Sequence, residues 1–129
     1  KFDYVIKIHT KSQVKWFDDI TDFLFSKNLI KLVKKQNKDC NCISHPEYIF
    51  KNNANQNSIL MEKYRYILTK KYFVRGTMFI CNTRIFNKVL NFVKKDYKPY
   101  LFNNMYDTNA VNEKKSPVHF LERLFGMIR

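Results

Sequence analysis

Polar and apolar residues alternate along residues 1–9. One side of this segment carries aromatic and β-branched residues (Phe2, Tyr4, Ile6 and Ile8), and the other side is mostly charged. This alternation predicts a half-buried β-strand. We expect the strand to lie inside a sheet, flanked by a strand at 72–81 or a short one near Ile43, since both have the hydrophobic density of central strands.

Apolar residues that recur every three or four positions predict helices along much of the remaining chain. The predicted helices cover residues 16–26, 29–38, 59–68 and 85–94. A short strand is predicted within 42–50 and a longer strand at 72–81. Gly76 interrupts the 72–81 strand, where a glycine often marks a bulge or the close approach of a ligand. The polar segments 51–58 and 98–115 predict loops.

The last segment of the chain has the clearest helical pattern. Ser116 is suited to cap the helix and Pro117 to occupy its first turn. An apolar stripe follows, made of Val118, Leu121, Leu124, Phe125 and Ile128. The other side carries His119, Glu122, Arg123 and Gly126, which share a face because of their i, i+3, i+4, i+7 spacing. We expect the stripe to be buried, which would turn the polar face toward the carboxyl edge of the sheet.

The order of these elements predicts an α/β fold, with a mixed sheet flanked by helices. No internal repeat and no proline- or glycine-rich linker divides residues 1–129, so we expect a single domain. The first residue already lies within a predicted strand. We therefore expect these residues to be the C-terminal part of a larger domain.

The composition favours a folded chain without a membrane span. Apolar residues make up 45% and aromatic residues 16%, which excludes a disordered chain. No apolar run approaches the roughly 18–20 residues that cross a bilayer. The net charge of +13 suits a nucleic-acid partner, but heavy use of Lys, Asn, Ile, Phe and Tyr is also what an AT-rich genome produces. Because the lysines are spread over several helix faces, we favour a solvated basic surface over nucleic-acid binding.

Three cysteines are present, an odd number without the spacing of a disulfide framework. They indicate a reducing compartment, which places the chain in the cytoplasm. Cys40, Cys42 and His45 offer three ligands to zinc, but a structural zinc site needs four and no second pair follows. The sequence therefore predicts ordinary thiols and no metal site.

Two polar blocks stand where a ligand would meet the predicted sheet. Residues 7–12 (Lys-Ile-His-Thr-Lys-Ser) leave the carboxyl end of the first strand, the edge at which open α/β sheets bind ligands. There His9 and Lys11 can neutralise a diphosphate while Thr10 donates a hydrogen bond. In the second block, Arg75 and Gly76 mark a place where a substrate can approach the backbone. A polar turn and a bulged core strand are the structural alternatives.

The last helix carries a third block. Glu122 beside His119 and Arg123 suits the abstraction of a proton from a hydroxyl group, and the arginine can hold a carboxylate or a phosphate. A surface helix stabilised by contacts within this face is the alternative. Neither a GxxxxGK phosphate loop nor an HExxH zinc motif is present.

In this order, the three blocks resemble the rhamnan-synthesis F family of glycosyltransferase-like proteins and related sequences of large DNA viruses. The matching motifs are Ile8-His9-Thr10-Lys11, Arg75-Gly76-Thr77-Met78-Phe79 and His119-Phe120-Leu121-Glu122-Arg123, with Trp16 after the first. The resemblance implies a GT-A-like fold, polysaccharide biosynthesis and, for a viral protein, the host cytoplasm. It also implies that the nucleobase-binding strands precede residue 1.

The resemblance further implies the transfer of a sugar, such as rhamnose or another deoxysugar, from a nucleotide-sugar donor to a glycan acceptor. Metal-dependent GT-A enzymes end the comparable strand with Asp-x-Asp, but here His9-Thr10-Lys11 stands in that place. We therefore expect a basic diphosphate site in which Arg123 takes part, with no cofactor and no support for a divalent metal. Glu122 resembles the acidic base of inverting enzymes. The alternative is a non-catalytic basic domain of the same fold that binds glycan or nucleic acid.

Overall fold

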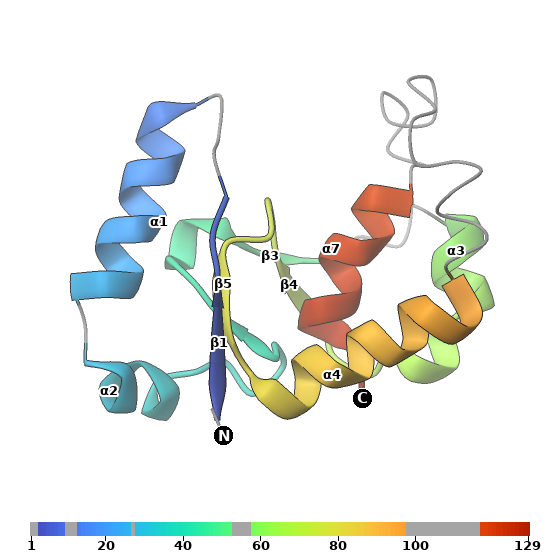
Figure 1. The fold of residues 1–129 in the computed structure, drawn as a ribbon. Helices are drawn as coiled ribbons and strands as arrows, with labels where there is room; N and C mark the ends of the chain where they lie inside the picture. The colour runs from blue at the N-terminus through green and yellow to red at the C-terminus, as the bar shows by residue number, and fades with distance from the viewer. Residues whose placement is uncertain (1–2, 10–12, 27, 53–57, 98–116) are drawn as a thin grey trace.

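Short strands and helices alternate along the chain (Figure 1). The computed structural model describes residues 3–9, 13–26, 28–52, 58–97 and 117–129, and leaves out the side chains of 26, 58–60, 96–97 and 117–119. The strands are β1 (Tyr4–Lys7), β2 (Cys42–Ile43), β3 (Ile49–Lys51), β4 (Tyr72–Val74) and β5 (Phe79–Asn82). The α-helices are α1 (Val14–Ser26), α2 (Leu29–Lys34), α3 (Ser58–Lys63), α4 (Thr83–Phe92) and α7 (Pro117–Met127). Two 3₁₀ turns, η1 (Pro46–Tyr48) and η2 (Arg65–Ile67), and a π-helical turn, η3 (Val93–Tyr97), complete the described elements.

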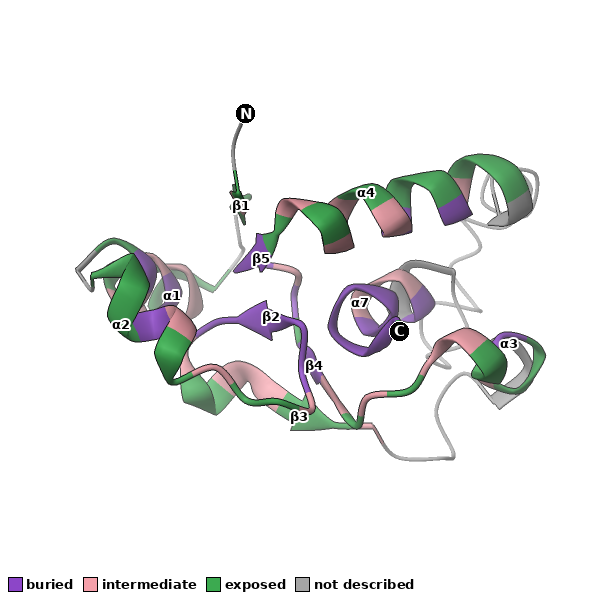
Figure 2. Ribbon diagram, turned by 90° about the horizontal axis from the view of Figure 1, so that it is seen from below, coloured by how far each residue is buried: buried purple, intermediate pink, exposed green. Residues whose placement is uncertain are grey.

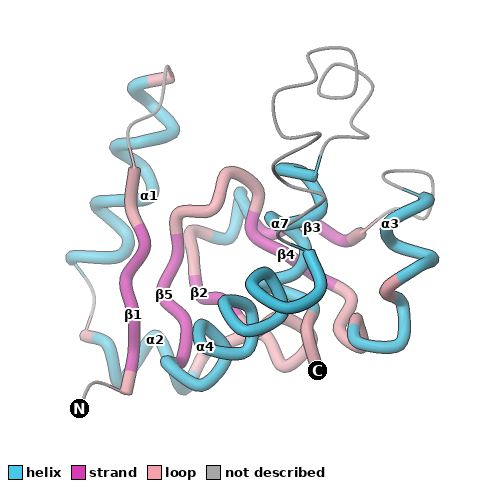
Figure 3. The backbone as a smooth tube through the Cα atoms, turned by 45° about the vertical axis from the view of Figure 1, so that its right-hand side comes forward, coloured by secondary structure: helices cyan, strands magenta, loops and turns pink. Residues whose placement is uncertain are grey.

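The predicted combination of helices and sheet is confirmed. The main sheet has the order β1-β5-β2, and β3 pairs with β4 in a second, two-stranded sheet (Figure 3). All of these pairings are antiparallel, whereas we had expected a mixed sheet. The predicted neighbour of β1 is correct, but its predicted position inside the sheet is wrong: β1 is an edge strand of the described sheet. Ile6 and Ile8 are accordingly 44% and 48% exposed.

The central strand β5 is buried on both faces. Phe79 and Cys81 point into one core cluster, while Met78 and Ile80 belong to another. This follows from the period of two along a strand, which sends successive side chains to opposite faces. Helices α1 and α2 cover one face of the sheet, and α4 and α7 cover the other (Figure 2).

The predicted strand at 72–81 is two strands. Gly76 and Thr77 both have positive backbone angles, with φ of 81° and 54°. Two successive residues of this kind reverse the chain direction, as in the tight turns of hairpins. The turn therefore separates β4 from β5, so that each strand joins a different sheet.

Helix α7 packs against β4 and is enclosed on several sides. Leu124, Phe125 and Ile128 of the predicted stripe are buried and Leu121 is half-buried, whereas Val118 lies outside the described side chains. The side that we expected to be polar is also buried, since Arg123 and Gly126 lie inside. A Cβ atom on Gly126 would lie 2.5 Å from the Cα atom of Phe73. The absence of a side chain there lets α7 approach the strand closely.

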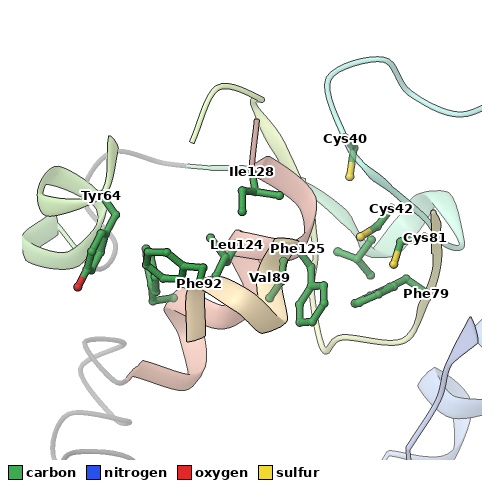
Figure 4. Close-up of a cluster of buried hydrophobic side chains, with 12 residues drawn as sticks. Cys40, Cys42, Tyr64, Phe79, Cys81, Val89, Phe92, Leu124, Phe125 and Ile128 are labelled. Carbon is green, nitrogen blue, oxygen red and sulfur yellow. The ribbon is translucent and has the colours of Figure 1, made fainter. Parts of the chain in front are cut away.

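The larger core cluster lies between β5, α4 and α7 (Figure 4). Phe79 and Phe125 pack at 5.0 Å between ring centroids, and Tyr64 meets Phe92 edge to face at the same separation. The side chains of Cys42 and Cys81 lie next to each other at the end of this cluster, from directly paired positions of β2 and β5. Burial of this apolar surface is the main source of stability for the α4–α7 face.

Candidate functional site

The carboxyl end of β1 meets the turn between β4 and β5. In the antiparallel register Lys7 is opposite Phe79, so the chain after β1 runs beside Gly76 and Thr77. The Nε2 atom of His9 lies 2.7 Å from the carbonyl oxygen of Gly76 and 3.1 Å from the hydroxyl of Thr77. The first and second sequence motifs are therefore in direct contact.

The third motif reaches the same residue. The backbone N–H of Gly76 donates a hydrogen bond of 2.9 Å to Oε1 of Glu122. Helix α7 carries Glu122 one turn before Gly126, where the helix is pressed against β4. Glu122 and His9 thus bind the N–H and the C=O of one residue, in what we call the Gly76 cluster, completed by Lys7 and Thr77.

Lys7 and Thr77 add a cation and a hydroxyl to the Gly76 cluster. The Lys7 ammonium donates to the carbonyl oxygen and to the hydroxyl oxygen of Thr77, each at 3.2 Å. Partial burial lowers the pKa of Lys7. Thr77 is β-branched, and a positive φ costs such a residue on the order of 1–3 kcal/mol. Strain of this kind is often found at functional sites, where the surrounding structure holds the conformation.

The contact with Gly76 determines which nitrogen of His9 carries a proton. A carbonyl oxygen only accepts hydrogen bonds, so Nε2 must be the donor at 2.7 Å. In the neutral ring Nδ1 is then the acceptor nitrogen.

Arg123 does not share an open face with Glu122. Its guanidinium is buried, with Nε donating to Oδ1 of Asn52 at 2.9 Å and the group stacked 4.5 Å from the ring centroid of Phe73. Burial lowers the pKa of Arg123, while the charge of Glu122 acts in the opposite direction. We expected Arg123 to bind a diphosphate. Because a side chain only 3% exposed does not present its donors to a ligand, the structure gives it a packing role instead.

Arg75 and Gly76 differ from the expected arrangement as well. We expected a substrate to approach the backbone at Gly76, but its N–H and C=O are engaged by Glu122 and His9. Arg75 is exposed and lies over the ring of Phe50, 5.4 Å from its centroid. A substrate at this place would meet the side chains around the turn rather than the Gly76 backbone.

Three predicted site residues are not placed. Thr10 and Lys11 lie outside the described residues, and of His119 only the backbone, in α7, is described. Conversely, Lys7 and Thr77 belong to the Gly76 cluster although neither was predicted as a site residue. The signal for Lys7 was available, because alternation along a strand places it on the same side as His9.

The cysteines are all buried, more deeply than the ordinary thiols that we expected. Burial raises the pKa of Cys42 well above its usual range and that of Cys40 to about 11. A hydrogen bond from Cys42 lowers the pKa of Cys81. Within the described ranges, no group of three or more His, Cys, Asp or Glu side chains is arranged to hold a metal ion.

No protein-family model matches the chain, and neither a curated protein nor a solved structure is similar enough to count as a match. Among the described helices, none combines the length and the apolar character needed to cross a membrane. The Gly76 cluster is thus the observation on which a functional argument rests.

Proposed function

We propose that this chain is part of a glycosyltransferase that moves a sugar, such as rhamnose or another deoxysugar, from a nucleotide-sugar to a glycan acceptor. One observation carries the proposal: His9, Gly76 and Glu122 come from the three motifs of the family resemblance and meet at one residue. His9 is 67 positions from Gly76 along the chain, and Glu122 is 46 positions away. The three motifs thus share one place in the fold, as the residues of one active site do.

Glu122 is the proposed base. It takes the proton of the acceptor hydroxyl as the hydroxyl oxygen bonds to the anomeric carbon of the donor. The bond from this carbon to the diphosphate breaks, and the diphosphate leaves with the electron pair. The hydrogen bond from the Gly76 N–H fixes the direction of the carboxylate, which is the positioning that general-base catalysis requires.

Lys7 and His9 are the proposed partners of the leaving diphosphate. Both contact the turn at Gly76 and Thr77, and Lys7 is held there by Thr77. A lysine cation and an N–H donor fixed in position before the reaction stabilise developing negative charge without the cost of reorganising solvent. Thr10 and Lys11 follow His9 in the same motif and remain proposed donor ligands, and His119 remains a proposed catalytic residue.

Replacement of Glu122 by glutamine in the full-length protein tests the proposal. The amide keeps the shape of the side chain but cannot take up a proton, so the transfer rate should fall by about 10²–10⁴. The measurement is the release of nucleoside diphosphate from a panel of nucleotide-sugars in the presence of glycan acceptors. Thermal unfolding shows whether the variant is folded.

Glu62→Gln is the matched control, because this exposed glutamate of α3 pairs with Arg65 at the surface, at 3.2 Å. Its transfer rate should equal that of the wild type. A well-folded Glu122→Gln protein with the wild-type rate would exclude Glu122 as the base.

A further inference from the structure

A cavity lies away from the Gly76 cluster, between the helix pair α1–α2 and the segment from β2 to β3. Its volume is about 660 Å³. Cavities that bind small molecules usually measure roughly 300–1,000 Å³, so this one has room for a ligand of that kind. Figure 2 shows α1 and α2 beside β2, and residues of both segments line the cavity.

The cavity has an apolar part formed by Phe23, Leu32, Ile43, Pro46 and Ile49. Leu32 and Ile43 are buried core residues, so this wall of the cavity belongs to the packed core. The ring of Phe23 is held edge to face by His45, at 5.5 Å between centroids and 72° between planes. An apolar group bound in this part would be removed from water and would contact side chains whose positions are already fixed.

Two lysines give the same cavity a positive charge. Lys31 of α2 and Lys35, the C-cap residue of this helix, both line it, one helical turn apart in the sequence. None of the residues that line the cavity is acidic. In the described part of the chain the ion pairs are Lys15–Asp19 and Arg65–Glu62, so neither cavity lysine is neutralised by a carboxylate within ion-pair distance.

We propose that this cavity is a binding site for a small amphipathic anion. The ligand has a flat apolar body that packs on Phe23 and Ile49, and one carboxylate, sulfonate or phosphate group that lies between Lys31 and Lys35. Asn28, which also lines the cavity, adds its side-chain N–H groups beside the charged group, while the amide nitrogen of Gln36 donates to the carbonyl oxygen of Cys40. The site does not depend on the proposed sugar transfer, since it shares no residue with the Gly76 cluster.

Two probes with the same ring test the site: 1-naphthalenesulfonate, which is an anion, and 1-naphthalenemethanol, which is neutral. Titration of the full-length protein by calorimetry should show saturable one-to-one binding of the sulfonate. Its affinity should exceed that of the alcohol by about tenfold, the effect expected from two exposed charge contacts. In nuclear magnetic resonance spectra, the bound ring should shift the methyl signals of Ile43 and Ile49.

The double variant Lys31→Gln/Lys35→Gln should lose this tenfold preference and still bind the alcohol, because both lysines are exposed and their loss leaves the fold intact. Lys34→Gln is the control: it removes one positive charge from α2, but Lys34 lines a different pocket. Its affinity for the sulfonate should be unchanged. The proposal would be overturned if both probes bound with equal affinity or if neither showed saturable binding. It would also be overturned if Lys34→Gln lost the preference for the sulfonate to the same extent as the double variant, or if the methyl shifts appeared elsewhere.

Discussion

Thr77 combines an unfavourable backbone conformation with two side-chain contacts in the Gly76 cluster. Its φ of 54° is costly for a β-branched residue, yet its hydroxyl contacts Lys7 and His9. A glycine would adopt the same φ at no steric cost but would leave both partners without this hydroxyl. The residue therefore fits a site in which stability is given up for the placement of chemical groups.

Comparison of Thr77→Gly with Thr77→Ala separates the strain from the contacts. Both variants lose the hydroxyl, but only glycine relieves the backbone. We expect the glycine variant to be more stable than the alanine variant by about 1 kcal/mol in chemical denaturation. Both should have reduced transfer activity, because His9 loses a partner in each. An alanine variant that is at least as stable as the glycine variant would show that the turn is not strained.

Cys40 makes stability depend on alkaline pH. Burial raises the pKa of its thiol from 9.0 to about 11, so the folded protein keeps the proton at pH values where the unfolded chain releases it. Unfolding then releases a proton, and the free energy of unfolding falls as the pH rises from about 9 to 11. The loss should reach about 2–3 kcal/mol. Denaturation at several pH values should show a smaller decrease in Cys40→Ala than in the wild type, and equal decreases would contradict the assignment to Cys40.

At the scale of elements, the helices were predictable and the strands were less so. A stripe of apolar residues repeats over several turns of a helix, so α1, α4 and α7 follow directly from the sequence. The break between β4 and β5 was missed because it depends on the positive φ of Thr77, a residue that sequence rules do not place in such a conformation. The edge position of β1 depends on partners far along the chain, which no local pattern encodes.

The candidate site divides in the same way. We expected the face that carries Glu122 to turn toward the sheet edge where His9 lies, because strand ends and helix faces can be placed from alternation and helical spacing, and both residues contact Gly76. The burial of Arg123 was not predicted. The i, i+3, i+4 spacing shows which residues share a helix face, but it does not show whether another element covers that face. The partners of Arg123 are Asn52 and Phe73, which lie in or next to strands far from α7 in the sequence. Residue spacing within one helix carries no information about such partners.

The close contact of α7 with β4 predicts a large effect of Gly126→Ala. The added Cβ would lie 2.5 Å from Cα of Phe73 and 2.7 Å from the carbonyl oxygen of Tyr72, both backbone atoms that cannot rotate away. Overpacking of this kind costs about 1–3 kcal/mol or more, so the melting temperature should fall by several degrees. Asn91→Ala, on the exposed side of α4, should change stability by less than about 0.5 kcal/mol. A melting temperature of Gly126→Ala that equals the wild-type value would show that the two elements are not in this contact.

At the scale of the whole molecule, the charge of +13 has to be reconciled with the proposed diphosphate-binding site. A nucleotide-sugar carries only its own phosphate charges, so its binding to the full-length protein should weaken only modestly with salt. Duplex binding would instead fall with a log–log slope of about −0.9 for each phosphate neutralised. Titrations at several salt concentrations check this. Tight, strongly salt-sensitive duplex binding without affinity for nucleotide-sugars would favour the basic binding domain over the enzyme.

Several strand pairings and hydrogen bonds of this structure join residues that are far apart in the sequence. Tyr4 is paired with Asn82, and the Asn41 side chain donates to the carbonyl oxygen of Ile128, 87 positions away. Each such contact requires a long loop to close before its energy is gained, which slows folding. Although much of this protein is helical, its core cannot be completed until α7 has docked on β4. We therefore expect it to fold on the milliseconds-to-seconds scale of β-rich domains rather than in the microseconds of a simple helical bundle.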